Sequence, residues 1–331
     1  FTDYEFMKSL ITGGAGFIGS HLVDALLDKG DEVVVLDNFS TGRPENLRHI
    51  EDQINVVKCD LSISGSWEKT FHGVARVFHL AALADIVPSI ENPEAYYLAN
   101  VNGTFNVMEA SKKYNIEKLI YSASSSCYGV PDLFPTPEIA EIRPQYPYAL
   151  TKFLGEQIVL HWNSVYNVPS ISTRFFNVYG PRSRTSGTYG AVFGVFLAQK
   201  LNKKPFTVVG DGTQTRDFTY VTDVVSALIS ASVSQLNGEV FNIGSDNTYS
   251  VNSLVELLKG EVVYIPKRPG EPDCTWADIS KAKSLLNWKP KVSLKSGVNS
   301  LIDNIDYWAQ APVWDPDSIS VATKKWFEYL G

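Results

Sequence analysis

The first half of the chain alternates short apolar runs with longer amphipathic segments. The apolar runs are rich in valine, isoleucine and leucine and have the length of buried strands, whereas the segments between them have helical spacing. Strands are expected at residues 8–12, 32–36, 54–59, 76–80 and 118–123, and helices at 17–29 and 93–114. Asn92 and Pro93 are residue types that begin a helix. Such alternation is typical of a parallel sheet with helices on both faces.

After residue 175 the pattern loosens into loops and shorter helices. Loops rich in glycine, proline and aromatic residues are expected at 177–189, 210–219 and 266–276, and helices at 191–201, 222–234 and 251–258. We therefore expect a main sheet domain over residues 7–175. A smaller α/β region is expected over 176–331, with some of its strands and helices returning to the first domain. Residues 1–6 precede Met7 and are expected to be a cloning remnant, and the apolar tail over 312–331 is expected to pack.

Composition and charge limit the possible partners. The 331 residues carry a net charge of −7 without a basic block, which argues against nucleic acid. No apolar run has the length of a membrane span. Cys59, Cys127 and Cys274 lie far apart and lack metal-ligand spacing. They are expected to be reduced thiols, with no metal site, in a cytoplasmic protein.

A glycine-rich segment between the first strand and the first helix predicts a dinucleotide site. Gly13, Gly16 and Gly19 have the spacing that permits a tight turn, close approach of a pyrophosphate and close packing of helix on strand. The helix would direct free N–H groups at the phosphates. Asp37, at the end of the second strand, would accept hydrogen bonds from the adenosine ribose and repel a 2′-phosphate, which favours NAD over NADP. The alternative for Asp37 is a carboxylate that caps a turn.

A second motif predicts acid–base chemistry. Tyr148 and Lys152 lie four residues apart and therefore share a helix face. An ammonium group beside a tyrosine favours the phenolate, so Tyr148 is expected to act as a general base. A run of serines at 122–126 follows the expected strand 118–123, at the sheet edge that faces a cofactor. In isolation, each motif is more often a surface pair or an ordinary loop.

Taken together, the motifs make the chain similar to the extended short-chain dehydrogenase/reductase family, and within it to the UDP-glucose 4-epimerase group. They occur in the family's order along nearly the whole chain. They are Gly13–Gly19, residues 37–42, Asp60-Leu61, residues 79–82, residues 100–104, the serine run, Tyr148 with Lys152, residues 174–181, residues 210–212, residues 216–218 and residues 276–278. The resemblance implies a Rossmann-type doubly wound parallel sheet with a smaller C-terminal α/β region that binds a sugar nucleotide.

The resemblance also implies a role for each site residue. Ser124, Tyr148 and Lys152 would be catalytic. The residues implied at NAD are Gly13, Gly16, Phe17, Ile18, Gly19, Asp37, Asn38, Ser40, Thr41, Gly42, Asp60, Leu61, Ala81, Ala82, Asn100, Tyr148 and Lys152. Those implied at the substrate are Ser124, Ser125, Ser126, Asn177, Arg216, Arg268 and Thr275.

The residues after Ser124 bear on which reaction the enzyme carries out. The family's dehydratases carry an Asp-Glu pair there and its decarboxylases a glutamate, whereas this chain has Ser125 and Ser126. Without a carboxylate to act at C5 or C6, the simplest reaction is inversion at C4 of a nucleotide-linked sugar. The alternatives are another sugar-nucleotide reaction, such as 4,6-dehydration or decarboxylation, and a non-catalytic NAD-binding sensor.

Two departures from the group bear on the substrate. Thr275 replaces the tyrosine that many bacterial epimerases carry, and the smaller side chain leaves room for a 2-acetamido group. Ala84 stands where some epimerases have a lysine, as in other branches of the family. The expected substrates are UDP-glucose or UDP-galactose and their N-acetylated relatives. The resemblance further implies a homodimer joined through the helices near 93–114 and 149–166.

Overall fold

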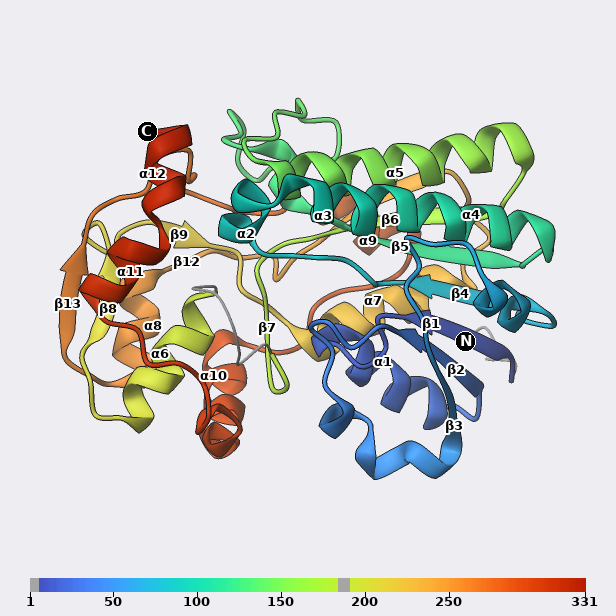
Figure 1. The fold of residues 1–331 in the computed structure, drawn as a ribbon. Helices are drawn as coiled ribbons and strands as arrows, with labels where there is room; N and C mark the ends of the chain where they lie inside the picture. Colours follow the sequence, from blue (N-terminus) through green and yellow to red (C-terminus); the bar gives the residue numbers. More distant parts are fainter. Residues whose placement is uncertain (1–5, 184–190) are drawn as a thin grey trace.

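The centre of the fold is one parallel sheet (Figure 1). A computed structural model describes residues 6–183 and 191–331. The seven strands run in the order β11-β6-β5-β4-β1-β2-β3. They are β1 (Lys8–Thr12), β2 (Glu32–Asp37), β3 (Ile54–Lys58), β4 (Arg76–His79), β5 (Lys118–Ser124), β6 (Ser170–Phe175) and β11 (Glu239–Ile243). The five strands expected from the sequence are present, and the predicted α/β doubly wound fold is confirmed.

Two strands extend the sheet beyond the sequence prediction. Strand β6 pairs with β5, and β11 pairs with β6, both in parallel. Because β11 comes from the second half of the chain, the two halves are not separate in space. The strand order reverses between β1 and β4, and ligands of such sheets bind at the carboxyl ends of the strands near this reversal.

Helices cover both faces of the sheet (Figure 1). On one face lie α1 (Phe17–Leu27) and α7 (Val221–Val233), and on the other α4 (Gly103–Lys113) and α5 (Pro147–Tyr166). The expected helix over 93–114 consists of α3 (Pro93–Tyr97), a π-helical turn (Leu98–Asn102) and α4. As predicted, Asn92 caps its start by accepting a hydrogen bond from the Ala95 N–H. The shorter helix α2 (Ile86–Glu91) precedes it.

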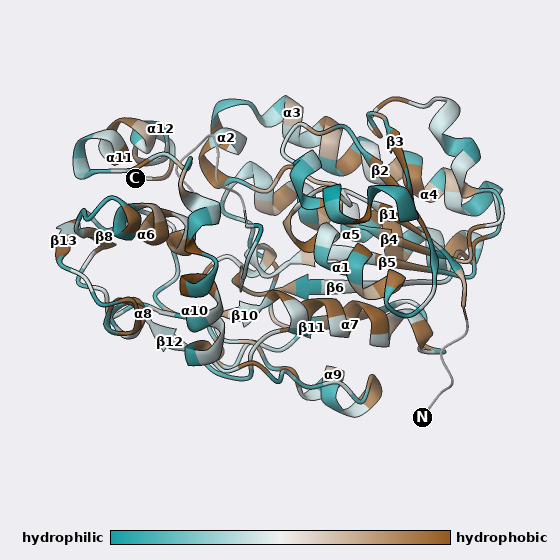
Figure 2. Cartoon of the chain, turned by 90° about the horizontal axis from the view of Figure 1, so that it is seen from below, coloured by the Kyte–Doolittle hydropathy of each residue, from teal (hydrophilic) through white to brown (hydrophobic). Residues whose placement is uncertain are grey.

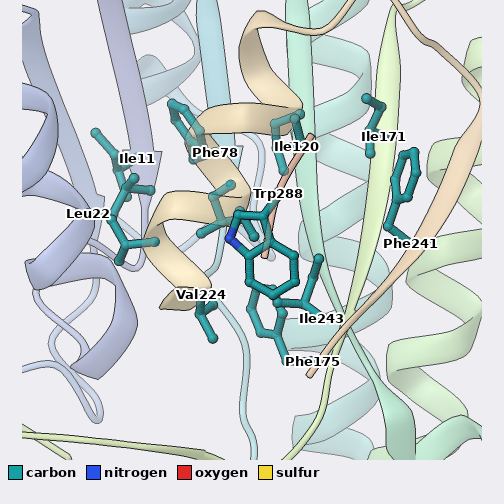
Figure 3. Close-up of a cluster of buried hydrophobic side chains, with 14 of the residues drawn as sticks. Ile11, Leu22, Phe78, Ile120, Ile171, Phe175, Val224, Phe241, Ile243 and Trp288 are labelled. Carbon is teal, nitrogen blue, oxygen red and sulfur yellow. The ribbon is translucent and has the colours of Figure 1, made fainter. Parts of the chain in front are cut away.

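Alternate residues of each central strand pack against opposite helix layers. In β1, Ile11 belongs to the core under α1 and α7, and Leu10 belongs to the core under α4 and α5. Figure 3 shows the first of these cores, in which Trp288 lies among side chains of the strands and of α7. The Trp288 indole N–H donates to Ser226 Oγ at 2.8 Å. Residues far apart in sequence therefore hold α7 on the sheet.

Helix α5 approaches the sheet closely, and a glycine makes this possible. A Cβ on Gly155 would lie 2.3 Å from the Tyr121 hydroxyl of β5. The same hydroxyl donates to the Lys152 carbonyl at 3.1 Å. A larger residue at 155 would push the helix away, so Gly155 sets the distance between the first turns of α5 and the end of β5.

The second half builds a smaller region beside the carboxyl ends of the strands (Figures 1 and 2). Its helices are α6 (Val192–Leu201), α8 (Val251–Leu258), α10 (Leu294–Asp303), α11 (Pro316–Ala322) and α12 (Lys324–Leu330), whereas α9 (Ser280–Leu285) packs against β11 of the main sheet. Its short strands form three pairs: β7 (Val178–Tyr179) with β10 (Thr219–Tyr220), β9 (Thr215–Arg216) with β12 (Tyr249–Ser250), and β8 (Phe206–Val209) with β13 (Val262–Ile265). A separate apolar core holds this region together. Among the described residues, none of the helices is both long and apolar enough to span a bilayer.

Candidate active site

A cavity of about 640 Å³ opens at the carboxyl ends of the central strands. Its walls include every residue that the sequence assigned to the cofactor, except Asn100, Tyr148 and Lys152. The predicted residues in the wall are Gly13, Gly16, Phe17, Ile18, Gly19, Asp37, Asn38, Ser40, Thr41, Gly42, Asp60, Leu61, Ala81 and Ala82. The structure therefore brings together residues that come from the ends of several different strands.

The glycine loop has the shape that a pyrophosphate requires. Gly13 has a φ of +71°, and a Cβ there would lie 2.8 Å from the Ala81 backbone. Gly16 precedes α1 in extended conformation and, as a glycine, has no side chain that could cap the helix. The N–H groups at the start of α1 therefore face the cavity wall and can bind an anion.

Asp37 ends β2 with its carboxylate oriented by the glycine loop. Its two oxygens accept hydrogen bonds from the N–H groups of Ala15, at 3.0 Å, and Phe39, at 2.8 Å. Burial raises the pKa of Asp37, while these two hydrogen bonds act in the opposite direction. Asp37 therefore fits both predictions from the sequence. Its carboxylate orders a turn, and the residue also lines the cavity in which the adenosine ribose would lie.

Several cavity residues could not be found by motif. Arg43 and Asn46 line the cavity beyond the glycine loop, and Ala311, Pro312 and Trp314 line it from the C-terminal segment. The only sequence signal for Arg43 and Asn46 is their place just after the 37–42 motif. The three tail residues lie about 300 positions from the glycine loop, and nothing in their local pattern indicates a site.

Asn100 joins the loop after β4 to helix α5. Its amide donates to the Leu83 carbonyl and to Thr151 Oγ1, both at 3.0 Å, and accepts from the Leu83 N–H at 2.8 Å. Both amide hydrogens are therefore used within the protein. Among the described residues Asn100 does not line the cavity, and its role at the cofactor stays a prediction.

A buried histidine supports the same loop. His79 Nδ1 lies 2.7 Å from Thr12 Oγ1, and Nε2 lies 3.0 Å from Thr104 Oγ1. Thr12 Oγ1 in turn accepts from the Ala81 N–H at 3.1 Å. Burial lowers the pKa of His79 to about 3. A neutral His79 thus helps to hold the backbone of the cavity wall.

The three predicted catalytic residues come from two elements. Ser124 ends β5, and Tyr148 and Lys152 lie in the first turns of α5. The Ser124 side chain lies close enough to Tyr148 to act on its pKa, against the larger effect of burial. Ser124 Oγ also lies 2.8 Å from Ser126 Oγ and accepts from the Ser126 N–H at 3.2 Å. A tyrosine is therefore held beside a serine at the cofactor edge of the sheet.

Burial dominates the electrostatics of this group. It raises the pKa of Tyr148 and lowers the pKa of Lys152 to about 7, while Glu156 acts on Lys152 in the opposite direction. Lys152 Nζ lies 4.5 Å from the centre of the Tyr121 ring. For the protein's own side chains, burial outweighs the groups that favour the phenolate, so the lowering of the Tyr148 pKa by Lys152 together with a nicotinamide ring stays a prediction.

Of the predicted substrate residues, Arg216 lines a second hollow, of about 570 Å³. Arg216 Nη2 lies 3.0 Å from a Glu271 oxygen, and Arg268 Nη1 lies 4.0 Å from the other oxygen. Glu271 and Gln214 line this hollow together with Arg216, and its wall also contains Asp211, Lys267 and Asp273. The two guanidinium groups can bind an anionic ligand through charge-assisted hydrogen bonds. Glu271 was not predicted as a site residue, although Glu271 lies only three residues after Arg268.

Asn177 and Thr275 lie together, as their predicted roles require. Thr275 Oγ1 donates to Asn177 Oδ1 at 2.7 Å and accepts from the Asp217 N–H at 3.2 Å. Asp217 is fully buried and also accepts from the Ala277 N–H at 3.0 Å. The Thr275 side chain is thus fixed from two sides.

One aromatic ring connects the two parts of the site. Tyr146 precedes α5, and its ring is nearly parallel to that of Tyr148, with centroids 6.4 Å apart. The charges of Tyr148, Glu271 and Arg216 all act on the Tyr146 hydroxyl. Tyr146 therefore lies close both to Tyr148, the proposed base, and to the ion pair of Arg216 with Glu271. Ser125 is half-buried in the turn after β5.

The described residues contain no cluster of three or more side chains suited to hold a metal ion. All three cysteines are unpaired in this part of the chain, as expected. Cys59 lines the cavity, where burial raises its thiol pKa to about 11. The residues predicted to carry the chemistry are Ser124, Tyr148 and Lys152.

Comparison with known proteins supports this assignment. Residues 9–244 match the NAD dependent epimerase/dehydratase family. The chain is 38% identical over 302 residues to a putative UDP-glucose 4-epimerase of Methanocaldococcus jannaschii, covering 89% of this chain and 97% of that protein.

Two solved structures have the same fold. A UDP-N-acetylglucosamine 4-epimerase from Methanobrevibacter ruminantium, bound to UDP-N-acetylmuramic acid, has a TM-score of 0.85 at 33% identity, over 91% of this chain and 100% of that one. A UDP-glucuronic acid 4-epimerase from Bacillus cereus, bound to UDP-glucuronic acid and NAD, has a TM-score of 0.84 at 34% identity, over 92% and 99%.

The buried His79 makes stability depend on pH. Its pKa is depressed on folding, so between about 6.5 and 3 the unfolded chain binds a proton that the folded chain does not, and stability is lost as the pH falls through this range. Between pH 7 and 5 this group alone should reduce the free energy of unfolding by about 2 kcal/mol. Urea titrations should show that His79→Gln lowers stability at pH 7 but has a shallower pH dependence. The exposed His161→Gln should keep the wild-type slope, and an unchanged slope for His79→Gln would disprove this role.

Proposed function

This chain belongs to the NAD dependent epimerase/dehydratase family, and we propose that it inverts the configuration at C4 of a UDP-linked hexose. The observation that carries this proposal is the position of Tyr148 close to Ser124, at the end of β5, with the buried Lys152 one turn further along α5. Positions 125 and 126 hold serines, so no carboxylate follows Ser124. The site thus offers acid–base chemistry at one carbon without a second group for elimination or decarboxylation.

The residues around the larger cavity fit NAD. The glycine loop and the start of α1 would bind the pyrophosphate, and Asp37 would bind the adenosine ribose. Lys152 would bind the nicotinamide ribose. NAD held by these residues would supply reversible hydride transfer at C4 and a positive ring charge that favours the Tyr148 phenolate.

Proton transfer is the protein's part of the reaction. Tyr148 would take the proton of the C4 hydroxyl and later return it, with Ser124 orienting both oxygens. Because burial raises the pKa of Tyr148, the phenolate forms only when positive charge is gathered around it. The protein's own contribution to that charge is Lys152.

The two arginines would hold the other end of the substrate. Arg216 and Arg268 can bind a diphosphate through charge-assisted hydrogen bonds, and Glu271 can accept hydrogen bonds from ribose hydroxyls. Asn177 and the serines at 125 and 126 would contact the sugar side. The relatives that act on UDP-glucose, UDP-N-acetylglucosamine and UDP-glucuronic acid support a UDP-sugar, and we propose UDP-glucose, UDP-galactose or a UDP-N-acetylhexosamine.

The direct test is to follow UDP-glucose and UDP-N-acetylglucosamine by proton NMR with purified enzyme. The C4 epimer should accumulate to a stable ratio without added reductant. Tyr148→Phe should reduce kcat by about 10²–10⁴-fold, the usual contribution of general acid–base catalysis, while bound NAD is retained. Loss of water or carbon dioxide from the sugar would contradict the proposal. Full activity of Tyr148→Phe would remove Tyr148 as the base.

Thr275 should select for the substituent at C2. In the Thr275→Tyr variant the larger ring should fill the space next to Asn177 and reduce kcat/KM for the N-acetylated sugar by tenfold or more, about 1.4 kcal/mol, with a smaller loss for UDP-glucose. Thr275→Ser keeps the hydroxyl that donates to Asn177 and is the matched control. Equal losses on both sugars in the tyrosine variant would contradict this role.

An exposed apolar face supports a homodimer as part of the proposal. Side chains on α3, the π-helical turn, α4 and α5 remain more than 40% exposed, although they are large and apolar; they are Tyr97, Leu98, Phe105, Leu150, Val165 and Tyr166. Apolar patches of this kind commonly mark contacts between subunits. We also propose a cytoplasmic location, which the unpaired cysteines of the described residues support.

A further inference from the structure

The C-terminal segment contacts both halves of the site. At the cofactor cavity, the Tyr307 hydroxyl donates to Asn46 Oδ1 at 3.1 Å, and the Arg43 guanidinium lies 5.0 Å from the Tyr307 ring. The next residues, 311–314, contribute to the cavity wall. Helices α11 and α12 then carry the chain to the substrate side, where α12 lies beside α2 (Figures 1 and 2).

Helix α12 delivers one buried aromatic side chain to the substrate loop. Trp326 is 3% exposed, and its indole N–H donates to the Pro269 carbonyl at 2.8 Å. The Arg268 guanidinium lies 5.4 Å from its ring centre. The Tyr146 ring lies 6.4 Å away. Trp326 thus contacts the loop, its arginine and the aromatic residue next to Tyr148.

These contacts constrain a side chain that otherwise has many conformations. Arginine loses substantial rotamer entropy when it is fixed on a ligand. The Trp326 ring provides a flat surface for the guanidinium, and the hydrogen bond to Pro269 anchors the adjacent backbone. The Arg268 side chain has therefore already lost part of its conformational entropy in the free protein, so ligand binding costs less entropy.

We propose that Trp326 is a positioning residue of the substrate site, which holds Arg268 and its loop ready for the diphosphate of the sugar nucleotide. This inference rests on the function proposed above and assigns a role in it to the C-terminal helix. Trp326 acts through Arg268 and does not act on the reacting carbon, so its loss affects binding more than turnover.

The test is UDP binding by calorimetry, with UDP-sugar kinetics beside it. Trp326→Leu, which keeps an apolar side chain but removes the ring and the donor, should weaken UDP binding about tenfold. KM should rise with little change in kcat, and NAD content should be unchanged. Trp326→Phe, which keeps a ring, should lose less. Tyr329→Ala changes an exposed aromatic residue of the same helix and should bind UDP like the wild type.

A double-mutant cycle separates positioning from general packing. If Trp326 acts through Arg268, then Trp326→Leu should add less than about twofold to the loss in an Arg268→Ala background. If the two substitutions weaken UDP binding independently, so that their fold losses multiply in the double variant, the inference is overturned. Unchanged UDP binding in both Trp326 variants would also overturn it. If Trp326→Leu does not fold, the Trp326→Phe cycle decides the question. Failure of the wild type to bind UDP would instead overturn the proposed function, and this inference with it.

Discussion

The junction between the end of β5 and the start of α5 is the constraint on which the site depends, because it places Ser124 close to Tyr148. The surrounding structure fixes this junction. Gly155 lets α5 lie close to Tyr121, and Glu156 of α5 pairs with Arg174 of β6 at 2.6 Å. Both members of that ion pair are buried, so it constrains the helix more than a surface pair would.

Desolvation decides the chemistry of the junction. Burial acts against the charged forms of both Tyr148 and Lys152, so the tyrosine is a weak base until positive charge gathers around it. Tyr148 therefore cannot act as a base unless cationic groups lie beside it. On the substrate side, Arg216 and Arg268 lie on either oxygen of the Glu271 carboxylate. The site thus separates a region of paired charges from a reacting centre at which burial disfavours charge.

The sheet and most of the cofactor wall could be predicted, because they depend on local patterns. A short segment of sequence determines the backbone geometry of the valine-rich strands, of the glycine loop and of the strand end at Asp37. Contacts between distant segments could not be predicted in this way. The return of β11 to the sheet, the approach of residues 311–314 to the cavity and the contact of Trp326 with Arg268 are set by tertiary packing. The internal use of both Asn100 amide hydrogens is likewise set by tertiary packing. Residues 184–190, part of an expected loop, lie outside the described residues.

The proposed reaction has Tyr148 acting at C4 alone, with no group acting at C5. The most direct measurement uses UDP-glucose deuterated at C4, converted in ordinary water, and unlabelled UDP-glucose converted in deuterium oxide. The account predicts that the C4 label stays in the UDP-galactose product and that no deuterium enters at C5. Loss of the C4 label to solvent, or incorporation of deuterium at C5, would contradict it.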